Sequence, residues 1–424
     1  MPSLRILMIS ALEVWALSGQ GGAASLFRTL EGYGRRGHRV DFIAPTIGAN
    51  HHYGAPLQQP PQIEGVRYHL FNLPSLGASR LPLPGVARKA DQKLRFANLF
   101  PLLAARQAER LFRQDDFDIL YGYEVHGVLA QRRVRRLHPL PLVARFQGTV
   151  MYPYLRRPQS LLRKFEEVRA LKTPAELYIM TDDGTRGDEV LQTLNPASAG
   201  KVCFWRNGLD VSGMPGLTSN GAHAAREELG LRDDDFVLVT ATRLARWKRV
   251  DRAIDAVALL RDEGISARLM VVGDGEERAN LQRQAHHLGL DGRVTFVGAV
   301  PQSEVPRYLG VADVFLSVNE LSNVGNPLLE AMVAGRCVLT LDEGDTRDLI
   351  RDGETGVLLP ASGEPRTIAG ALSQLARDPD RRRRLGAAAH RLAERSFWSW
   401  DQRLDAEVAA VEALVSGRQP PPGQ

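Results

Sequence analysis

Short runs of apolar residues alternate with segments of helical periodicity along nearly the whole chain. In the first half, the strand-like runs are LRILMIS, HRVDFIAP, FDILYGYE, PLVARFQG, ELYIMTD and KVCFWRNG. In the second half, they are DFVLVTATRL, ARLMVVGDG, RVTFVGAV, DVFLSV and RCVLTLD. Strands that alternate with helices of about 10–15 residues predict parallel sheets covered by helices on both faces. The pattern therefore predicts an α/β fold built from doubly wound sheets.

The alternation weakens in the stretch NGLDVSGMPGLTSNGAHAA, which is rich in Gly and Ser and has no strong period. A chain of 424 residues also exceeds the roughly 250–300 residues at which one hydrophobic core usually stops growing. We therefore predict a linker near residues 210–225 between two domains, 1–210 and 211–395. Residues 396–424 are predicted to form a final helix that ends in a short disordered tail of Pro, Gly and Gln.

The amino-terminal stretch ILMISALEVWALSG is as apolar as the core of a signal peptide. Because Glu13 interrupts it and only Arg5 supplies positive charge ahead of it, we predict instead a buried first strand from Arg5 to Ser10. No later run approaches the ~20 apolar residues that a membrane-spanning helix needs. The chain has two cysteines, too few for a disulfide framework or a clustered metal site. A cytoplasmic location without a bound metal is expected.

Charge is distributed unevenly between the two predicted domains. Residues 1–210 hold 28 Lys and Arg against 18 Asp and Glu, a balance of +10, and the remainder holds 26 against 31, a balance of −5. Much of the excess lies between Arg88 and Arg113, where Leu, Phe and Ala separate the basic residues, and residues 132–136 read RRVRR. This region is either a solvated helix face or a basic amphipathic surface that meets an anionic membrane. No module for binding RNA or DNA is recognisable, so nucleic acid is not expected as a partner.

A glycine-rich loop follows the first predicted strand. Gly19, Gly21 and Gly22 in SGQGGAASLF precede a helix. Glycines let the backbone approach a ligand closely, and the N–H groups of a helix start favour anions. The spacing is not GxGxxG, and no acidic residue stands where the ribose of a dinucleotide would be held. The loop is therefore either a simple tight turn or one wall of a cleft between domains.

Two motifs of the second half place charged residues after predicted strands. Arg243 and Lys248 lie five positions apart in ATRLARWKRV, where a loop turns into a helix, and two fixed cations there suit a diphosphate. In SNVGNPLLEAMVAG, a polar loop begins at Ser322, Pro327 is predicted at the first position of a helix, and Glu330 in its first turn. Glu330 either complements the helix dipole or holds the two hydroxyls of a ribose.

The order and spacing of these motifs resemble the retaining nucleotide-sugar glycosyltransferases of family four, which have the GT-B architecture of two Rossmann-like domains facing a cleft. The resemblance runs from the glycine loop through RGHRVDFIAP, RNGLD, TRLARWK, VVGDGEE, VTFVGAV and NPLLEAMVAG to DLIRDGETGVLLP. It implies transfer of a sugar from a UDP or GDP sugar to a glycan, glycolipid or other acceptor in cell-envelope or exopolysaccharide biosynthesis. It further implies a retaining mechanism without a metal, at the inner face of the membrane, and a C-terminal helix that crosses back to the first domain.

The resemblance also implies roles for residues on the donor side. Arg243 and Lys248 would neutralise the diphosphate, and this charge stabilisation of the leaving group is the largest catalytic effect we expect. Glu330 would hold the ribose, and the backbone around Val300 would face the base. The other positions implied to contact the donor are Gly21 and Gly22 in the first domain and Ser322, Asn323, Gly325, Asn326, Leu328 and Leu329 in the second.

Two positions depart from the family pattern. The family's pair of glutamates is eight positions apart, which puts the first at Ser322; this residue is not acidic, and Glu320 is out of register. Gln147 in ARFQGT stands where many relatives carry a histidine that faces the acceptor. His126 in YEVHGVLA is a second acceptor-side and catalytic candidate, or a structural histidine. Beside glycosyl transfer, these departures leave open a nucleotide-sugar epimerase or phosphorylase of the same fold, or a catalytically silent partner protein.

Overall fold

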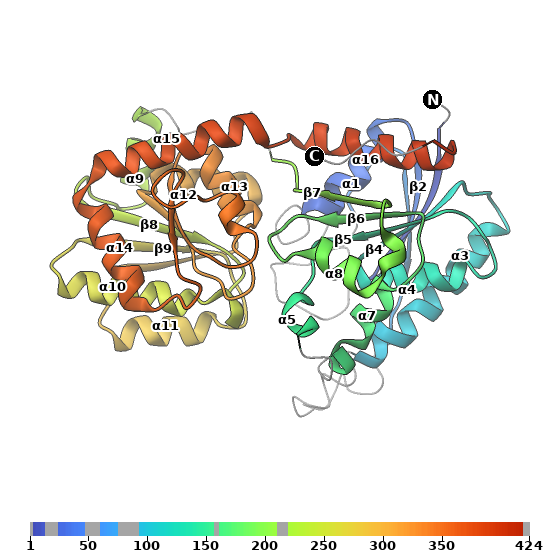
Figure 1. The fold of residues 1–424 in the computed structure, drawn as a ribbon, viewed down its shortest axis with the longest axis horizontal. Coiled ribbons are helices and arrows are strands. Elements are labelled where there is room, and N and C mark those ends of the chain that lie inside the picture. The colour runs from blue at the N-terminus through green and yellow to red at the C-terminus, as the bar shows by residue number, and fades with distance from the viewer. Residues whose placement is uncertain are drawn as a thin grey trace.

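Two parallel sheets organise the chain, one in each half (Figure 1). The structure is a computed structural model and describes residues 3–12, 24–46, 60–74, 93–156, 161–209 and 219–418. Each sheet is covered by helices on both faces, as the alternation of strand-like and helix-like segments predicts. The predicted α/β class and the doubly wound arrangement are confirmed.

The first sheet contains seven parallel strands in the order β3-β2-β1-β4-β5-β6-β7. The strands are β1 (Arg5–Ser10), β2 (Arg39–Pro45), β3 (Val66–Phe71), β4 (Ile119–Tyr123), β5 (Leu142–Phe146), β6 (Leu177–Thr181) and β7 (Val202–Trp205). β1 coincides with the buried first strand predicted from the sequence. The order of strands reverses between β1 and β4, and open α/β sheets bind ligands outside the carboxyl ends of their strands at such a switch point.

Two groups of helices cover the faces of the first sheet. One face packs against α1 (Ala24–Arg35) and the last helix of the chain, α16 (Trp400–Val415). The other face is covered by α3 (Phe100–Phe112), α4 (Glu124–Val134), α7 (Phe165–Leu171) and α8 (Gly187–Leu194), while the short α5 is Tyr152–Leu155. A π-helical turn, Arg95–Leu99, leads directly into α3.

The second sheet contains six parallel strands in the order β10-β9-β8-β11-β12-β13, so its order reverses between β8 and β11. The strands are β8 (Phe236–Ala241), β9 (Ala267–Val272), β10 (Val294–Gly298), β11 (Val314–Ser317), β12 (Cys337–Leu341) and β13 (Val357–Leu359). Around it lie α9 (Ser219–Glu228), α10 (Val250–Asp262), α11 (Arg278–His287), α12 (Val305–Val311), α13 (Asn326–Val333), α14 (Pro365–Arg377) and α15 (Pro379–Ser396). Helices α10, α11 and α14 share one core with this sheet, and α12 and α13 share the other.

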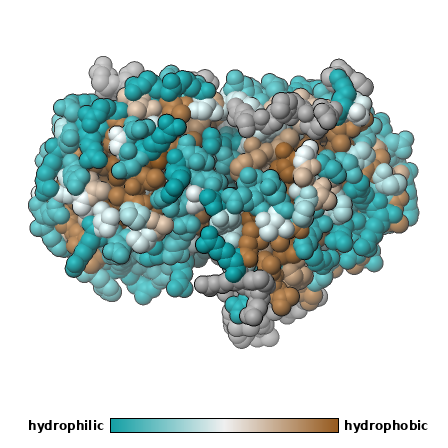
Figure 2. Space-filling view, viewed as in Figure 1, coloured by the Kyte–Doolittle hydropathy of each residue, from teal (hydrophilic) through white to brown (hydrophobic). Residues whose placement is uncertain are grey.

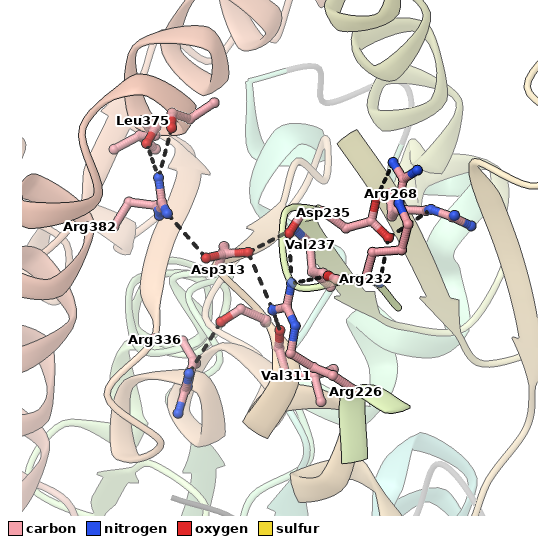
Figure 3. A network of polar contacts seen from close by, with 12 residues as sticks. Arg226, Arg232, Asp235, Val237, Arg268, Val311, Asp313, Arg336, Leu375 and Arg382 are labelled. Atoms are coloured by element: carbon pink, nitrogen blue, oxygen red, sulfur yellow. Dashed lines mark hydrogen bonds and ion pairs between the residues drawn. The ribbon is translucent and has the colours of Figure 1, made fainter. Parts of the chain in front are cut away.

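Arginine–carboxylate contacts tie together the amino-terminal ends of strands in the second sheet (Figure 3). Asp313, just before β11, lies 3.7 Å from Arg226 of α9 and 3.3 Å from Arg382 of α15. Asp235, just before β8, lies 3.1 Å from Arg268 of β9. These contacts hold together the amino-terminal ends of the strands. Ligands of such sheets bind at the opposite edge, outside the carboxyl ends of the strands.

Two helix boundaries differ from the sequence prediction. Helix α9 begins at Ser219, inside the predicted linker, because the Ala- and Glu-rich run that follows favours a helix and packs against α12; residues 210–218 lie outside the described residues. Helix α13 begins at Asn326, one residue earlier than predicted, because the carbonyl of extended Gly325 already accepts helical hydrogen bonds. Pro327 is therefore the second helical residue, and Glu330 lies beyond the first turn.

Helix α16 crosses back from the second half and packs beside α1 on the first sheet, as predicted (Figure 1, red). Its Glu407 is fully buried and accepts hydrogen bonds from the Tyr121 hydroxyl at 2.6 Å and from Arg403 at 3.0 Å. Glu407 also pairs with Arg145 of β5. Burial alone would raise the pKa of Glu407, but Arg145 and Arg403 outweigh it and hold the pKa below its usual value. The helix is thus anchored by charge as well as by apolar contact.

Candidate functional site

Polar residues gather where β4, β5 and β6 end, at one edge of the first sheet. Glu124 follows β4, Gln147 follows β5, and Asp183 lies two residues beyond the end of β6. The Gln147 N–H donates to Glu124 Oε1 at 2.6 Å. Because these strands are parallel neighbours, the residues after their carboxyl ends meet beside the switch point of the sheet.

Glu124 combines an unusual backbone with an unusual acidity. Its φ is +63°, in the left-handed region that few non-glycine residues occupy, and such residues cluster at functional sites. Burial raises the pKa of its carboxyl to about 7, although the Gln147 N–H and the Arg145 guanidinium oppose the increase. Sequence analysis did not single out Glu124, because an acid at a helix start is ordinary and no sequence pattern reports its φ.

Asp183 is the second carboxyl with raised pKa at this edge. Burial raises its pKa to about 7, partly offset by Thr185, whose hydroxyl and N–H donate to Oδ1 at 2.5 and 3.1 Å. Lys248 of the second half also lowers the Asp183 pKa, so the two groups sense each other's charge. Gly148 has φ +98°, and a Cβ there would lie 2.1 Å from Asp183 Oδ2, so only glycine fits. Sequence analysis missed Asp183 because TDDG has the composition of an ordinary turn.

Lys248 faces Asp183 from the second half of the chain. It closes the 3₁₀ turn Arg246–Lys248 between β8 and α10, and its Nζ lies 3.9 Å from the centre of the Trp247 ring. Burial lowers the pKa of Lys248 to about 8, Asp183 opposes this, and Arg243 adds to it. Arg243 is more exposed and lies 3.4 Å from Glu276. The two predicted cations are therefore close enough to repel each other, which an anion between them would relieve.

Ser322 is buried between the two halves of the chain rather than open to a ligand. Its hydroxyl donates to the main-chain carbonyl of Asp183, and a Cβ on the adjacent Gly184 would lie 3.0 Å from Ser322 Oγ. Ser322 thus holds the segment that carries Asp183 against the second half. Glu320, the acid out of register with the family pattern, pairs with Arg249 at the start of α10.

Glu330 lies beside the loop that follows β10. Its side chain is buried, with 7% of the residue exposed, and Gln302 Nε2 donates to Glu330 Oε1 at 3.0 Å. Gln302 follows Val300 by two residues, so the structure brings the predicted ribose ligand next to the predicted base-binding backbone. The helix-dipole explanation for Glu330 loses force, because that effect falls off within the first turn of a helix.

The loop before α13 is held by its own amides. Asn323 Oδ1 accepts from the Asn319 N–H at 2.9 Å and from the Ser317 hydroxyl at 3.0 Å, so the side chain of Asn323 shapes the loop. Asn326 Oδ1 accepts from Asn207 Nδ2 at 3.2 Å, which joins the segment after β7 to the start of α13. Asn323 and Asn326, both predicted to contact the donor, therefore also make hydrogen bonds within the protein.

Backbone groups at the start of α13 divide into engaged and available ones. The N–H groups of Leu328 and Leu329 donate to the Gly325 carbonyl at 2.9 and 3.3 Å, and both side chains are buried in the core beneath. Pro327 has no N–H. The first positions of a helix lack intrahelical acceptors, which leaves the N–H groups of Gly325 and Asn326 as those that an anion could meet.

The two residues predicted on the acceptor side bond within the first half of the chain. His126 Nε2 lies 2.9 Å from Glu166 of α7. The amide of Gln147 lies between the Tyr123 hydroxyl at 2.8 Å and the Arg145 guanidinium at 3.0 Å. Gln147 is therefore linked through Arg145 to the carboxylate of α16, and its backbone rather than its side chain contacts Glu124.

Gly21 and Gly22 lie outside the described residues. Among residues that the structure describes, no group of three or more His, Cys, Asp or Glu side chains is arranged to hold a metal ion. No described helix combines the length and the apolar composition that crossing a bilayer requires.

The chain folds into two domains, each built on a doubly wound sheet. Hydrogen bonds join the segments after β6 and β7 of the first domain to the segment after β11 of the second, and the C-terminal helix returns to the first domain. This arrangement is the GT-B fold. Residues 222–392 match the family model of the glycosyl transferases group 1. The match lies within the second half of the chain.

Several known proteins are similar to this chain over part or nearly all of its length. The D-inositol 3-phosphate glycosyltransferase of Thermomonospora curvata is 32% identical over 280 residues, which cover 62% of this chain and 64% of that relative. Anabaena Alr3699/HepE, solved in complex with UDP and glucose, superposes with a TM-score of 0.69 at 18% identity over 97% of this chain and 99% of that one. Sucrose-phosphate synthase from Thermosynechococcus elongatus superposes with a TM-score of 0.76 at 17% identity over 98% and 100%. The two structures show the fold.

The sequence matches are partial. Four curated relatives are matched over 42–64% of their own length, so the chain spans about half the length of the relatives it matches.

Proposed function

We propose that the protein is a retaining glycosyltransferase that takes a sugar from a UDP or GDP sugar. The acceptor is a glycan or a lipid-linked molecule of cell-envelope or exopolysaccharide biosynthesis, met at the cytoplasmic face of the membrane. Residues 211–395 bind the donor, and residues 1–210 bind the acceptor. Among similar proteins, Anabaena Alr3699/HepE was solved with UDP-glucose, and a relative in Rhizobium meliloti is named a lipopolysaccharide core biosynthesis glycosyltransferase.

The observation that carries the proposal is a pair of cations in the second domain. Arg243 lies close enough to Lys248 for its charge to lower the pKa of Lys248, and it lies 3.4 Å from the partly exposed Glu276. The pair neutralises the diphosphate of the donor, and Glu330 beside Gln302 holds its ribose. Stabilising charge that develops on a leaving group is usually the largest single contribution to catalysis.

Ser322 supplies no carboxylate toward the transferred sugar, and Asp183 supplies it instead. Ser322 binds the main-chain carbonyl of Asp183, so the segment that carries Asp183 lies next to the position of the family's first glutamate. In the reaction, the bond from the anomeric carbon to the phosphate oxygen breaks and a bond to the acceptor oxygen forms on the same face. The acceptor proton passes to the leaving phosphate, and no metal takes part. The charges of Asp183 and Lys248 position the sugar between them.

Sugar transfer from UDP and GDP sugars to membrane-extracted acceptor tests the proposal. We expect Lys248→Ala to lower kcat/KM roughly 100-fold, the usual effect of removing one group that stabilises transition-state charge. Asp183→Asn should lower kcat while the affinity for the nucleotide alone changes little. The product should keep the anomeric configuration of the donor, which NMR of the isolated product reports.

Matched controls separate these effects from general damage. Lys201→Ala and Asp234→Asn remove exposed charges of the same kind away from the site and should leave transfer unchanged. Unchanged transfer by Lys248→Ala would overturn the donor site. Turnover of the donor without any acceptor would replace transfer by an epimerase-like reaction. Absence of any nucleotide binding in calorimetry would identify a catalytically silent protein instead.

A further inference from the structure

Four arginines line a small hollow on the first domain, away from the edge where Glu124 and Asp183 lie. The hollow, about 50 Å³ in volume, is formed between α4, α7 and the turn that leads into α3. The basic side chains that line it are Arg132, Arg133, Arg136 and Arg169, and Asn98 and Pro101 complete its wall. Among the residues that the structure describes, none that lines this arginine niche is acidic.

The arginines of the niche differ from Arg135 in having no counter-ion among the residues that the structure describes. Arg135, within the same RRVRR run, lies next to Glu176 at 2.5 Å and donates to the Pro174 carbonyl at 2.9 Å. In the part of the chain that the structure describes, Arg132, Arg133, Arg136 and Arg169 form no ion pair. Four guanidinium groups that share a hollow repel one another unless an anion joins them, and arginine binds phosphate with paired hydrogen bonds.

Exposed leucines lie on the segments that form the niche or lead into them. Leu162, before α7, is 79% exposed; Leu137, directly after Arg136, is 62% exposed; and Leu94, one turn before Asn98, is 48% exposed. Lys93 Nζ lies 3.4 Å from the carbonyl oxygen of Arg163, so the segments that carry Leu94 and Leu162 are adjacent. Figure 2 shows apolar surface bordered by polar surface in this lower part of the first domain, where α7 lies in Figure 1.

We propose that this niche binds the phosphate of an anionic lipid headgroup while these exposed leucines enter the membrane interface. Protruding apolar side chains beside unpaired cations are the features of an interfacial surface. A site for free phosphate would need the arginines but has no use for the leucines. The inference rests on the proposed function, because it orients the first domain toward a bilayer from which a lipid-linked acceptor is taken.

The niche places the membrane contact elsewhere than on the stretch between Arg88 and Arg113, where the sequence suggested it. Six apolar side chains of α3 are buried, and Leu103 and Phe112 pack partly buried against the core of the first domain; the six are Phe100, Pro101, Ala104, Ala105, Ala108 and Leu111. They therefore cannot insert into a bilayer. Arg106, Arg110 and Arg113 stay exposed on the outer side of α3 and add positive charge only.

Vesicle co-sedimentation of the full chain tests the proposal. Wild-type protein should bind vesicles that contain phosphatidylglycerol and should not bind pure phosphatidylcholine. The double variant Arg133→Gln/Arg136→Gln should bind the anionic vesicles roughly 30-fold more weakly, since each basic residue near such a surface contributes about 1 kcal/mol. Both arginines are exposed, so folding should be retained.

The matched control Arg366→Gln/Arg384→Gln removes the same charge from exposed positions of the second domain. An equal loss of binding in this control, or binding of wild type to both vesicle types or to neither, would overturn the proposal. A thermal shift of wild type by inorganic phosphate, absent in the niche variant and accompanied by no vesicle binding, would identify a free-phosphate site instead. Stabilisation by UDP is measured in the same samples. Because the niche is remote from Lys248, failure of wild type to bind anionic vesicles while it still binds UDP refutes the niche alone, whereas failure of wild type to bind UDP refutes the proposed function.

Discussion

Three ionisable side chains at the meeting point of the domains have pKa values displaced toward neutrality. Glu124 and Asp183 are raised to about 7, and Lys248 is lowered to about 8. Burial is the main cause in each case, because each group loses water without gaining a full ion pair. Groups tuned in this way, close together in a cleft, are typical of catalytic and binding sites.

The lowered pKa of Lys248 predicts how nucleotide binding depends on pH. In the proposed donor site the charged form holds the diphosphate, and this form is lost as the pH rises through about 8. The affinity for UDP or GDP should therefore fall above pH 8, by up to about tenfold for each pH unit. Calorimetric titration between pH 7 and 10 measures this dependence.

Lys248→Arg supplies the control for this prediction, because a guanidinium stays charged over the whole range. Its affinity should be almost independent of pH. An equally steep decline in Lys248→Arg, or a flat profile in wild type, would show that another group controls binding.

At the residue scale, candidate residues on the donor side can be proposed from the sequence more readily than those buried at the edge of the first sheet. Lys248, Arg243 and Glu330 belong to local motifs whose spacing along the chain carries information. Asp183 and Glu124 owe their properties to burial, to a left-handed backbone and to residues of other strands. No local pattern contains these features, so they could only be found in the folded chain.

At the scale of elements, α16 likewise has contacts that no local sequence pattern predicts. The sequence predicted a helix near the end of the chain, and the family resemblance implied that it crosses back to the first domain. The partners of Glu407 could not be predicted, since Arg145 and Tyr121 precede it by 262 and 286 residues. A glutamate flanked by alanines and valines in AEVAAVEAL gives no sign that it will be buried.

Glu407→Ala should strongly destabilise the first domain. It leaves Arg145 and Arg403 buried without their carboxylate, and removing one partner of a buried ion pair typically costs about 3–5 kcal/mol. Hydrogen–deuterium exchange of the β4 and β5 amides should report the loss as faster exchange, with the second sheet unaffected.

Asp405→Ala, two residues earlier on the same helix, is the control. Asp405 pairs with Arg36, but 67% of its side chain is exposed, and exposed pairs contribute about 0–1 kcal/mol. Similar exchange rates in the two variants would mean that α16 is held by its apolar face alone.

At the scale of the whole molecule, the two domains meet through close backbone contacts. Gly344 has φ +62°, and a Cβ there would lie 1.9 Å from the carbonyl oxygen of Gly184. Next to this contact, Arg186 lies 3.2 Å from Asp345, and Ser322 binds the main chain of Asp183. The general architecture of two sheets was predictable from the alternation of strands and helices. The contact between the domains was not predictable, because it depends on Gly184 and Gly344, which lie in ordinary turns.

This contact predicts that Gly344→Ala separates donor binding from catalysis. The added Cβ cannot be accommodated against Gly184, so the domains must move apart and Asp183 must move away from Lys248. The affinity for the nucleotide should change little, since Lys248, Arg243 and Glu330 all belong to the second domain. Turnover should fall about 100-fold, the scale of loss when reacting groups are misplaced by about 1 Å. Small-angle scattering should show a larger radius of gyration.

Gly353→Ala separates the effect of the contact from that of backbone conformation. Gly353 has φ +75° in the same domain, and nothing lies within 4 Å of an added Cβ. Both substitutions force a left-handed alanine, which costs roughly 1–2 kcal/mol, but only Gly344→Ala collides with the other domain. If both variants lose turnover equally, the cause is strain within the second domain. If turnover falls only in Gly344→Ala and the radius of gyration rises with it, the closed contact is the arrangement in which sugar transfer takes place.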